Sequence, residues 1–250
     1  MKRLLVLTGI IISIALLAAC SASSHALKTG DITDENLSAV CGVLEEHGLH
    51  NVSTFKKWVE DTDSKSEQED NDGFSDADCR MTVMLLAGDD IEYENVEDSY
   101  DGTYLMFDMD VIDNNKLYGV LKEKQQLFTT LFGEMKIPED GFDHVFTDNL
   151  KQHGIRFTGS EYSVISILFK AYQMPDAFVG HTGILVPYGS GYMFIEKIAF
   201  SDPYRLTVVK DEKELISVLS ERPEYTVEPG EPAPLVYRND EVIGSLDQRN

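Results

Sequence analysis

Basic residues are scarce in this chain, which has 21 Lys and Arg against 44 Asp and Glu in 250 residues. The formal net charge of -23 would repel a phosphate backbone, so we exclude ordinary nucleic-acid binding. Cysteine is also rare, and three residues are too few for a disulfide framework. The chain is nevertheless 42% hydrophobic and 10% aromatic, which is too apolar for a disordered protein and enough to build a core.

The apolar stretch within the first nineteen residues is too short to span a membrane. Lys2 and Arg3 precede a stretch without charge, residues 4–19. A spanning helix needs about 20 apolar residues, and this stretch is shorter. A short positive segment followed by a short apolar one is typical of a secretory signal peptide.

The end of that stretch carries a second signal. The run Leu17-Ala18-Ala19-Cys20 resembles the lipobox of bacterial lipoproteins. The resemblance implies cleavage before Cys20, lipidation of its thiol, and anchoring to the outer face of the cytoplasmic membrane. We therefore predict a lipoprotein signal peptide at 1–19, a tether at 20–32 and a single α+β domain at 33–250. A plain signal peptide followed by an incidental cysteine remains the alternative.

Hydrophobic periodicity changes along the chain. Apolar residues recur at helical spacing in a first set of segments, which are 33–47, 52–59, 80–87, 116–132 and 142–152. Runs of β-branched and aromatic residues follow, separated by Gly or Pro, at 163–169, 177–186, 192–200 and 206–210. Asp211 and Glu214 predict the start of one more helix, and 235–246 predicts a hairpin. The order predicts an α+β fold in which N-terminal helices pack on a mostly antiparallel sheet.

An acidic stretch, residues 60–78, holds nine carboxylates and one lysine. It contains Asp70-Asn71-Asp72-Gly73, which faintly suggests a calcium loop. An EF-hand with Gly73 at its sixth position would place Gln68 first and Cys79 last, and neither residue fits those ligand positions. We therefore predict a solvated loop, and we expect no cofactor.

Three residues form a candidate catalytic group. Cys79 follows residues that favour a helix start, where free N–H groups and the helix dipole favour a thiolate and can stabilise an oxyanion. His181 opens a predicted strand, and Glu196 lies on the next strand after a turn at Gly189-Ser190-Gly191. A carboxylate that orients an imidazole, which in turn takes the proton of a thiol, is the arrangement of a cysteine hydrolase.

The order Cys, His and a third polar group resembles the papain-like cell-wall peptidases of the NlpC/P60 kind. A second resemblance covers most of the chain: Cys79-Arg80-Met81-Thr82, the run from Gly180 to Pro187, and the run from Phe194 to Phe200 are similar to a family of Gram-positive lipoproteins, domain of unknown function 4300. The first resemblance implies a papain-like fold in which Cys79, His181 and Glu196 are catalytic. The second implies a surface lipoprotein and carries no activity.

Three functions remain open at this stage. The first is a membrane-anchored hydrolase of amide or peptide bonds, with a peptide or cell-wall material as substrate. The second is a non-catalytic surface lipoprotein that binds a partner, in which Cys79 and Cys41 are both inert packed thiols. The third and weakest is an acidic protein that buffers cations through residues 60–78.

Overall fold

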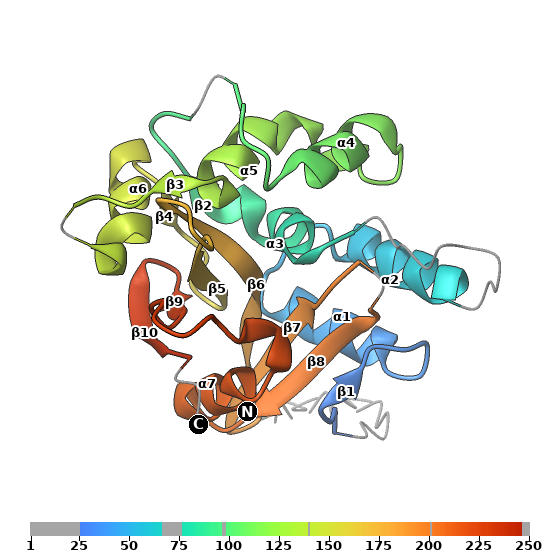
Figure 1. Cartoon of the computed structure of the whole chain (residues 1–250). Helices are drawn as coiled ribbons and strands as arrows, with labels where there is room; N and C mark the ends of the chain where they lie inside the picture. Colours follow the sequence, from blue (N-terminus) through green and yellow to red (C-terminus); the bar gives the residue numbers. More distant parts are fainter. Residues whose placement is uncertain (1–25, 67–76, 97–98, 140, 201, 247–250) are drawn as a thin grey trace, which may run out of the picture.

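The computed structural model describes residues 26–66, 77–96, 99–139, 141–200 and 202–246 (Figure 1). The expected signal peptide, Cys20 and the middle of the acidic stretch lie outside the described residues. Their assignments therefore stay predictions. Among the described residues, no helix combines the length and the apolar character that a membrane crossing requires.

The centre of the fold is an antiparallel sheet, as the sequence predicts. Its strands run in the order β1-β8-β7-β6-β5-β9-β10, and β3 pairs with β6. The strands are β1 (Gly30–Asp31), β3 (Met135–Lys136), β5 (Ser163–Lys170), β6 (Asp176–Tyr188), β7 (Gly191–Lys197), β8 (Tyr204–Val209), β9 (Leu235–Arg238) and β10 (Glu241–Ser245). A separate small ladder joins β2 (Ile91–Glu92) to β4 (Arg156–Phe157).

Helices cover the sheet from two sides (Figure 1). Most precede the long strands: α1 (Leu37–Glu46), α2 (Val52–Ser66), α3 (Cys79–Ala87), α4 (Met106–Asn114), α5 (Gln125–Phe132) and α6 (Val145–His153). One helix, α7 (Glu212–Ser220), follows them. Short 3-10 turns are η1 (Gly88–Asp90), η2 (Gly119–Lys124), η3 (Phe142–His144) and η4 (Pro223–Tyr225). The α+β class is therefore confirmed.

Apolar side chains that alternate between the two faces of the strands form two separate cores. On β6, Ile184 and Val186 join the large core on the side of the early helices, while Leu185 joins a smaller core with Leu215 and Leu219 of α7. Successive residues of a strand point to opposite faces, so one strand can serve both cores. Of the early helices, α3 lies directly against β6 and β7, and all its residues except Arg80 are buried.

Several predicted boundaries are wrong. The segment 116–132 is not one helix, because η2 occupies 119–124 and only Gln125–Phe132 is α-helical. The second helix runs on to Ser66, well past the predicted end at residue 59 and into the stretch expected to be a loop. Helix α4 was not predicted, and its apolar pattern is weak because acidic residues interrupt it. Local propensity is a weak guide where packing against neighbouring elements decides the backbone.

Part of the expected tether packs on the domain. Gly30 and Asp31 pair with β8, and Ile32 is completely buried. The backbone N–H of Ile32 also donates to the carbonyl of Tyr204 at 2.7 Å. The folded part of the chain therefore begins before residue 33.

Candidate functional site

The first residue of α3 is Cys79, and the residue before it caps the helix. The Oδ1 atom of Asp78 accepts a hydrogen bond from the backbone N–H of Met81 at 2.8 Å, in the manner of an N-cap. Thr82 strengthens the turn by donating its hydroxyl to the carbonyl of Asp78 at 2.7 Å. The predicted helix start is confirmed, and Cys79 is 5% exposed at that position.

A bulge in β6 positions His181. The pairing of β5 with β6 runs from Ile167–His181 directly to Leu168–Val179, which leaves Gly180 as an extra residue. A bulge bends its strand and re-aims the neighbouring side chains. A Cβ atom on residue 180 would lie 2.6 Å from the ring of Phe169, so glycine is needed there for the close approach of that ring.

Strands β6 and β7 separate next to this bulge. Their last pair is Gly183 with Glu196, and His181 lies two residues beyond it on β6. His181 and Glu196 are therefore diagonal neighbours on the same face rather than directly opposite residues. Cys79 at the start of α3 and Tyr225 of η4 lie near the imidazole at this point.

The structure brings the three predicted residues together. The Nε2 atom of His181 lies 2.8 Å from Oε2 of Glu196, and both side chains are almost completely buried. Cys79 lies close enough to the imidazole to act on the pKa of His181. Burial alone would lower the pKa of His181, but the interactions with Cys79 and Glu196 outweigh it and raise the pKa to about 9.

A fourth residue, Arg222, was missed at the sequence level. It follows α7 and donates from Nη1 to Oε2 of Glu196 at 2.7 Å and from Nη2 to Oε1 at 2.5 Å. Burial would raise the pKa of Glu196, yet the contacts with Arg222 and His181 lower it to about 2. Glu196 is therefore a carboxylate held by two partners. No spacing rule links residues 196 and 222, so only the fold could reveal this pair.

A buried lysine also lies near the cysteine. Lys197 is completely buried, and its ammonium group donates to the carbonyls of Ala199 at 2.8 Å and Phe200 at 3.1 Å, and to that of Asp202. Burial lowers its pKa to about 8, although interactions with Asp202, Asp78 and Cys79 oppose that shift. The lysine therefore holds the loop after β7 and adds positive charge near the sulfur.

Neighbouring groups offset the negative charge of Asp78, the residue just before Cys79. Arg80 lies 2.7 Å from Oδ2 of Asp78 and donates two hydrogen bonds, each 3.1 Å long, to Asp108. Burial and the neighbouring Asp78 raise the pKa of Asp108 to about 8. The pKa of Asp78 is lowered, because Arg80 and Asp108 outweigh the effect of burial. The positive charge of Arg80 thus offsets the aspartate beside Cys79.

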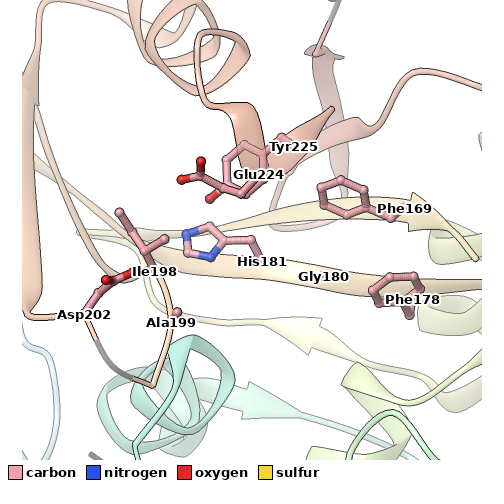
Figure 2. Close-up of a pocket in the computed structure, with 9 residues that line it drawn as sticks. All are labelled: Phe169, Phe178, Gly180, His181, Ile198, Ala199, Asp202, Glu224 and Tyr225. Carbon is pink, nitrogen blue, oxygen red and sulfur yellow. The ribbon is translucent and has the colours of Figure 1, made fainter. Parts of the chain in front are cut away.

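A pocket of about 500 Å³ opens beside His181. Figure 2 shows the imidazole in the middle of the pocket, Phe169 and Phe178 on one side, and Ile198 and Asp202 on the other. The other lining residues are Gly180, Ala199, Glu224 and Tyr225. His181 is the member of the predicted group that lines the pocket, whereas Cys79 is buried and is not one of the lining residues.

The remaining candidates lie elsewhere. Cys41 is buried on α1 in the large core, and burial raises its pKa, as expected of an inert packed thiol. No group of three or more His, Cys, Asp or Glu able to hold a metal is found within the described residues. The cation-buffering hypothesis concerns residues 60–78, and 67–76 lie outside the described part of the chain.

The fold and the site define an α+β protein in which hydrogen-bonded, buried His181, Glu196 and Arg222 lie near Cys79 at the start of a helix. The chain belongs to the family described as Domain of unknown function (DUF4300), whose model matches residues 48–243. No curated protein and no solved structure matches this chain. The predicted membership in this family is confirmed. The lipoprotein character and the relationship to papain-like peptidases remain proposals.

Proposed function

We propose that this protein is an extracellular hydrolase of amide or peptide bonds, held at the outer face of the cytoplasmic membrane by a lipid on Cys20. The observation that supports the chemistry is the hydrogen bond between His181 and Glu196 beside the pocket, with Cys79 close enough to raise the pKa of the imidazole. A thiol, an imidazole and a carboxylate in hydrogen-bonded order are the parts that covalent amide hydrolysis needs. A papain-like arrangement, with the cysteine on a helix start and the histidine on a sheet, is part of this proposal.

Each residue has a defined role in the proposed reaction. His181 takes the proton of Cys79, and the thiolate attacks the carbonyl carbon of the amide. The C–N bond then breaks, His181 protonates the departing amine, and a thioester remains on Cys79. A water molecule, deprotonated by His181, attacks the thioester; the acid leaves and the thiol is restored. Glu196 orients the imidazole and stabilises its cationic form, and Arg222 holds Glu196.

The first test compares two equally buried thiols. Cys79 and Cys41 are 5% and 8% exposed, so burial alone predicts similar reaction rates. The proposal predicts that iodoacetamide at neutral pH modifies Cys79 at least about tenfold faster, because its proton can pass to His181. A His181→Gln variant should remove the difference. Mass mapping of the modified peptides provides the measurement, and equal rates in the unaltered protein would contradict the proposal.

The second test concerns the anchor. Cells that express the full chain are grown with an alkyne-tagged fatty acid, and the protein is examined for the tag. We expect labelled protein in the membrane fraction, and unlabelled protein from a Cys20→Ser variant. Label that persists in Cys20→Ser would contradict lipidation at that residue.

One observation favours a second function. Cys79 does not appear among the residues that line the pocket, although His181 does. A protein that only binds a ligand in this pocket would need the imidazole and not the sulfur. In that case Cys79→Ala would keep all ligand binding and all cellular function, and Cys79 would react no faster than Cys41.

A further inference from the structure

The pocket beside His181 has two chemically different ends. Phe169 and Phe178 form one wall, and Figure 2 shows both rings on the same side of the imidazole. Asp202 lies on the opposite side, and the carboxylate of Glu224 lies above the imidazole in this view. No lysine or arginine is found among the described residues that line this space.

The aromatic wall belongs to a longer row of rings. Tyr104 stacks on Phe178 with centroids 4.5 Å apart, and Phe178 stacks on Phe169 at 6.0 Å. Phe169 then meets Tyr225 at 5.9 Å, and Tyr225 meets the imidazole of His181 at 5.5 Å. The row leads from partly exposed rings to the reacting group, so an apolar side chain can lie along it and remain close to His181.

The acidic end is held in place by the fold. The carbonyl of Asp202 accepts a hydrogen bond from the buried ammonium group of Lys197, which fixes the loop at that side of the pocket. Glu224 lies in η4, next to Tyr225, whose hydroxyl accepts a hydrogen bond from Arg222 at 3.2 Å. The backbone of Asp202 is thus held by Lys197, and Glu224 is held by its place in η4 beside Tyr225.

We propose that the pocket binds a peptide in which an apolar or aromatic side chain lies next to a cationic one. The first lies on Phe169 and Phe178, and the second lies between Asp202 and Glu224. Charge complementarity supports the cation, since Asp202 and Glu224 line the pocket and no lysine or arginine is among its described lining residues. This inference rests on the proposed function in one respect, which is that an amide bond of the peptide lies beside His181. The binding preference does not require that this bond is cleaved.

The test uses the full chain in detergent with Cys79→Ala, so that binding is measured without turnover. The probes are capped tetrapeptides with a central Phe-Lys, Phe-norleucine, Phe-Glu or Ala-Lys pair, each made in both residue orders. Calorimetry gives the Kd of each probe. We expect the Phe-Lys probe to bind at least about threefold tighter than Phe-norleucine and tighter still than Phe-Glu. The Ala-Lys probe should bind at least about tenfold more weakly than Phe-Lys, because it lacks the ring.

Matched variants assign the preference to its residues. Asp202→Asn together with Glu224→Gln should abolish the preference for Phe-Lys over Phe-norleucine, and 0.5 M salt should weaken it. Glu221→Gln alters an exposed carboxylate three residues away from Glu224 and should leave the preference intact. Phe178→Leu keeps apolar bulk but removes the ring, and should weaken the Phe probes about threefold while sparing Ala-Lys.

The outcomes separate the two proposals. No binding of any probe at millimolar concentration, equal affinity of the Lys and norleucine probes, or a preference that survives the double substitution would overturn the inference. If the preference is found but Cys79 reacts no faster than Cys41, the peptide site stands and the hydrolase proposal fails. If Cys79 is reactive but the probes bind alike, only the peptide inference fails.

Discussion

Arg222 and Glu196 face each other across two parallel hydrogen bonds, Nη1–Oε2 at 2.7 Å and Nη2–Oε1 at 2.5 Å. The two residues come from the end of a helix and from a central strand, and they meet in the smaller core beside Tyr225. A guanidinium that binds a carboxylate in this way fixes both its position and its charge. Glu196 can therefore hold the imidazole of His181 in one orientation.

The first prediction concerns the loss of Arg222. An Arg222→Met variant leaves the buried carboxylate of Glu196 without its strongest partner, and we expect the free energy of unfolding to fall by about 3 kcal/mol. Urea titration at neutral pH provides the measurement. Arg156→Met removes an exposed arginine that pairs with Glu92 and Glu94, and should have a much smaller effect. An equal fall in the free energy of unfolding in the two variants would show that the buried pair stabilises the protein no more than the exposed one.

The second prediction is a pH dependence of stability. The pKa of His181 is about 9 in the fold against 6.5 as its ordinary value, so folding favours the protonated ring. Its stabilising contribution is fully present below pH 6.5 and is lost as the pH rises through 9. For Glu196, with a pKa of about 2 against 4.5, the contribution is present above pH 4.5 and is lost as the pH falls through 2.

Urea titrations between pH 3 and pH 10 on the natural chain and on His181→Gln test this dependence. The difference in stability between the two proteins should be largest near pH 5–6 and should shrink from pH 6.5 to pH 9. A difference that stays constant over that range would mean that His181 does not take up a proton on folding.

The third prediction concerns the loop after β7. Lys197 donates to carbonyls of this loop from a completely buried position, so Lys197→Met removes the donors and leaves the carbonyls unpaired. We expect backbone hydrogen exchange at residues 198–200 and 202 to become at least about tenfold faster, with little change in the central strands. Lys136→Met, which alters a lysine whose side chain is 80% exposed, is the control and should leave that segment unchanged.

The fourth prediction compares two glycines. A Cβ atom on residue 183 would lie 2.6 Å from the backbone oxygen of Ile195 and 2.5 Å from the ring of Phe194, and the backbone of a central strand cannot move away. Gly183→Ala should therefore cost about 1–3 kcal/mol of stability. Gly42 lies inside α1 with open space around it, so Gly42→Ala should stabilise the protein by about 0.5–1 kcal/mol. In thermal unfolding, Gly183→Ala should lower the Tm and Gly42→Ala should raise it.

Local patterns determined a large part of this protein. The helix start before Cys79, the capped start of α7 after Asp211 and the hairpin around Asn239 all follow from residues close together in the chain. The alternation along 163–210 likewise predicts the central strands. These features depend on contacts between near neighbours, which sequence reasoning can evaluate.

The tertiary structure decided the rest, because it joins groups that no local rule connects. The sequence named Cys79, His181 and Glu196, but their contact depends on the bulge at Gly180 and on the separation of β6 from β7. Arg222 and Lys197 became part of the site only in the folded protein. Burial removes water from their charged groups, so each must lie where carboxylate or carbonyl oxygens accept its hydrogen bonds. The chain by itself thus specified which reactive groups exist, and long-range packing decided which of them meet and which one faces the pocket.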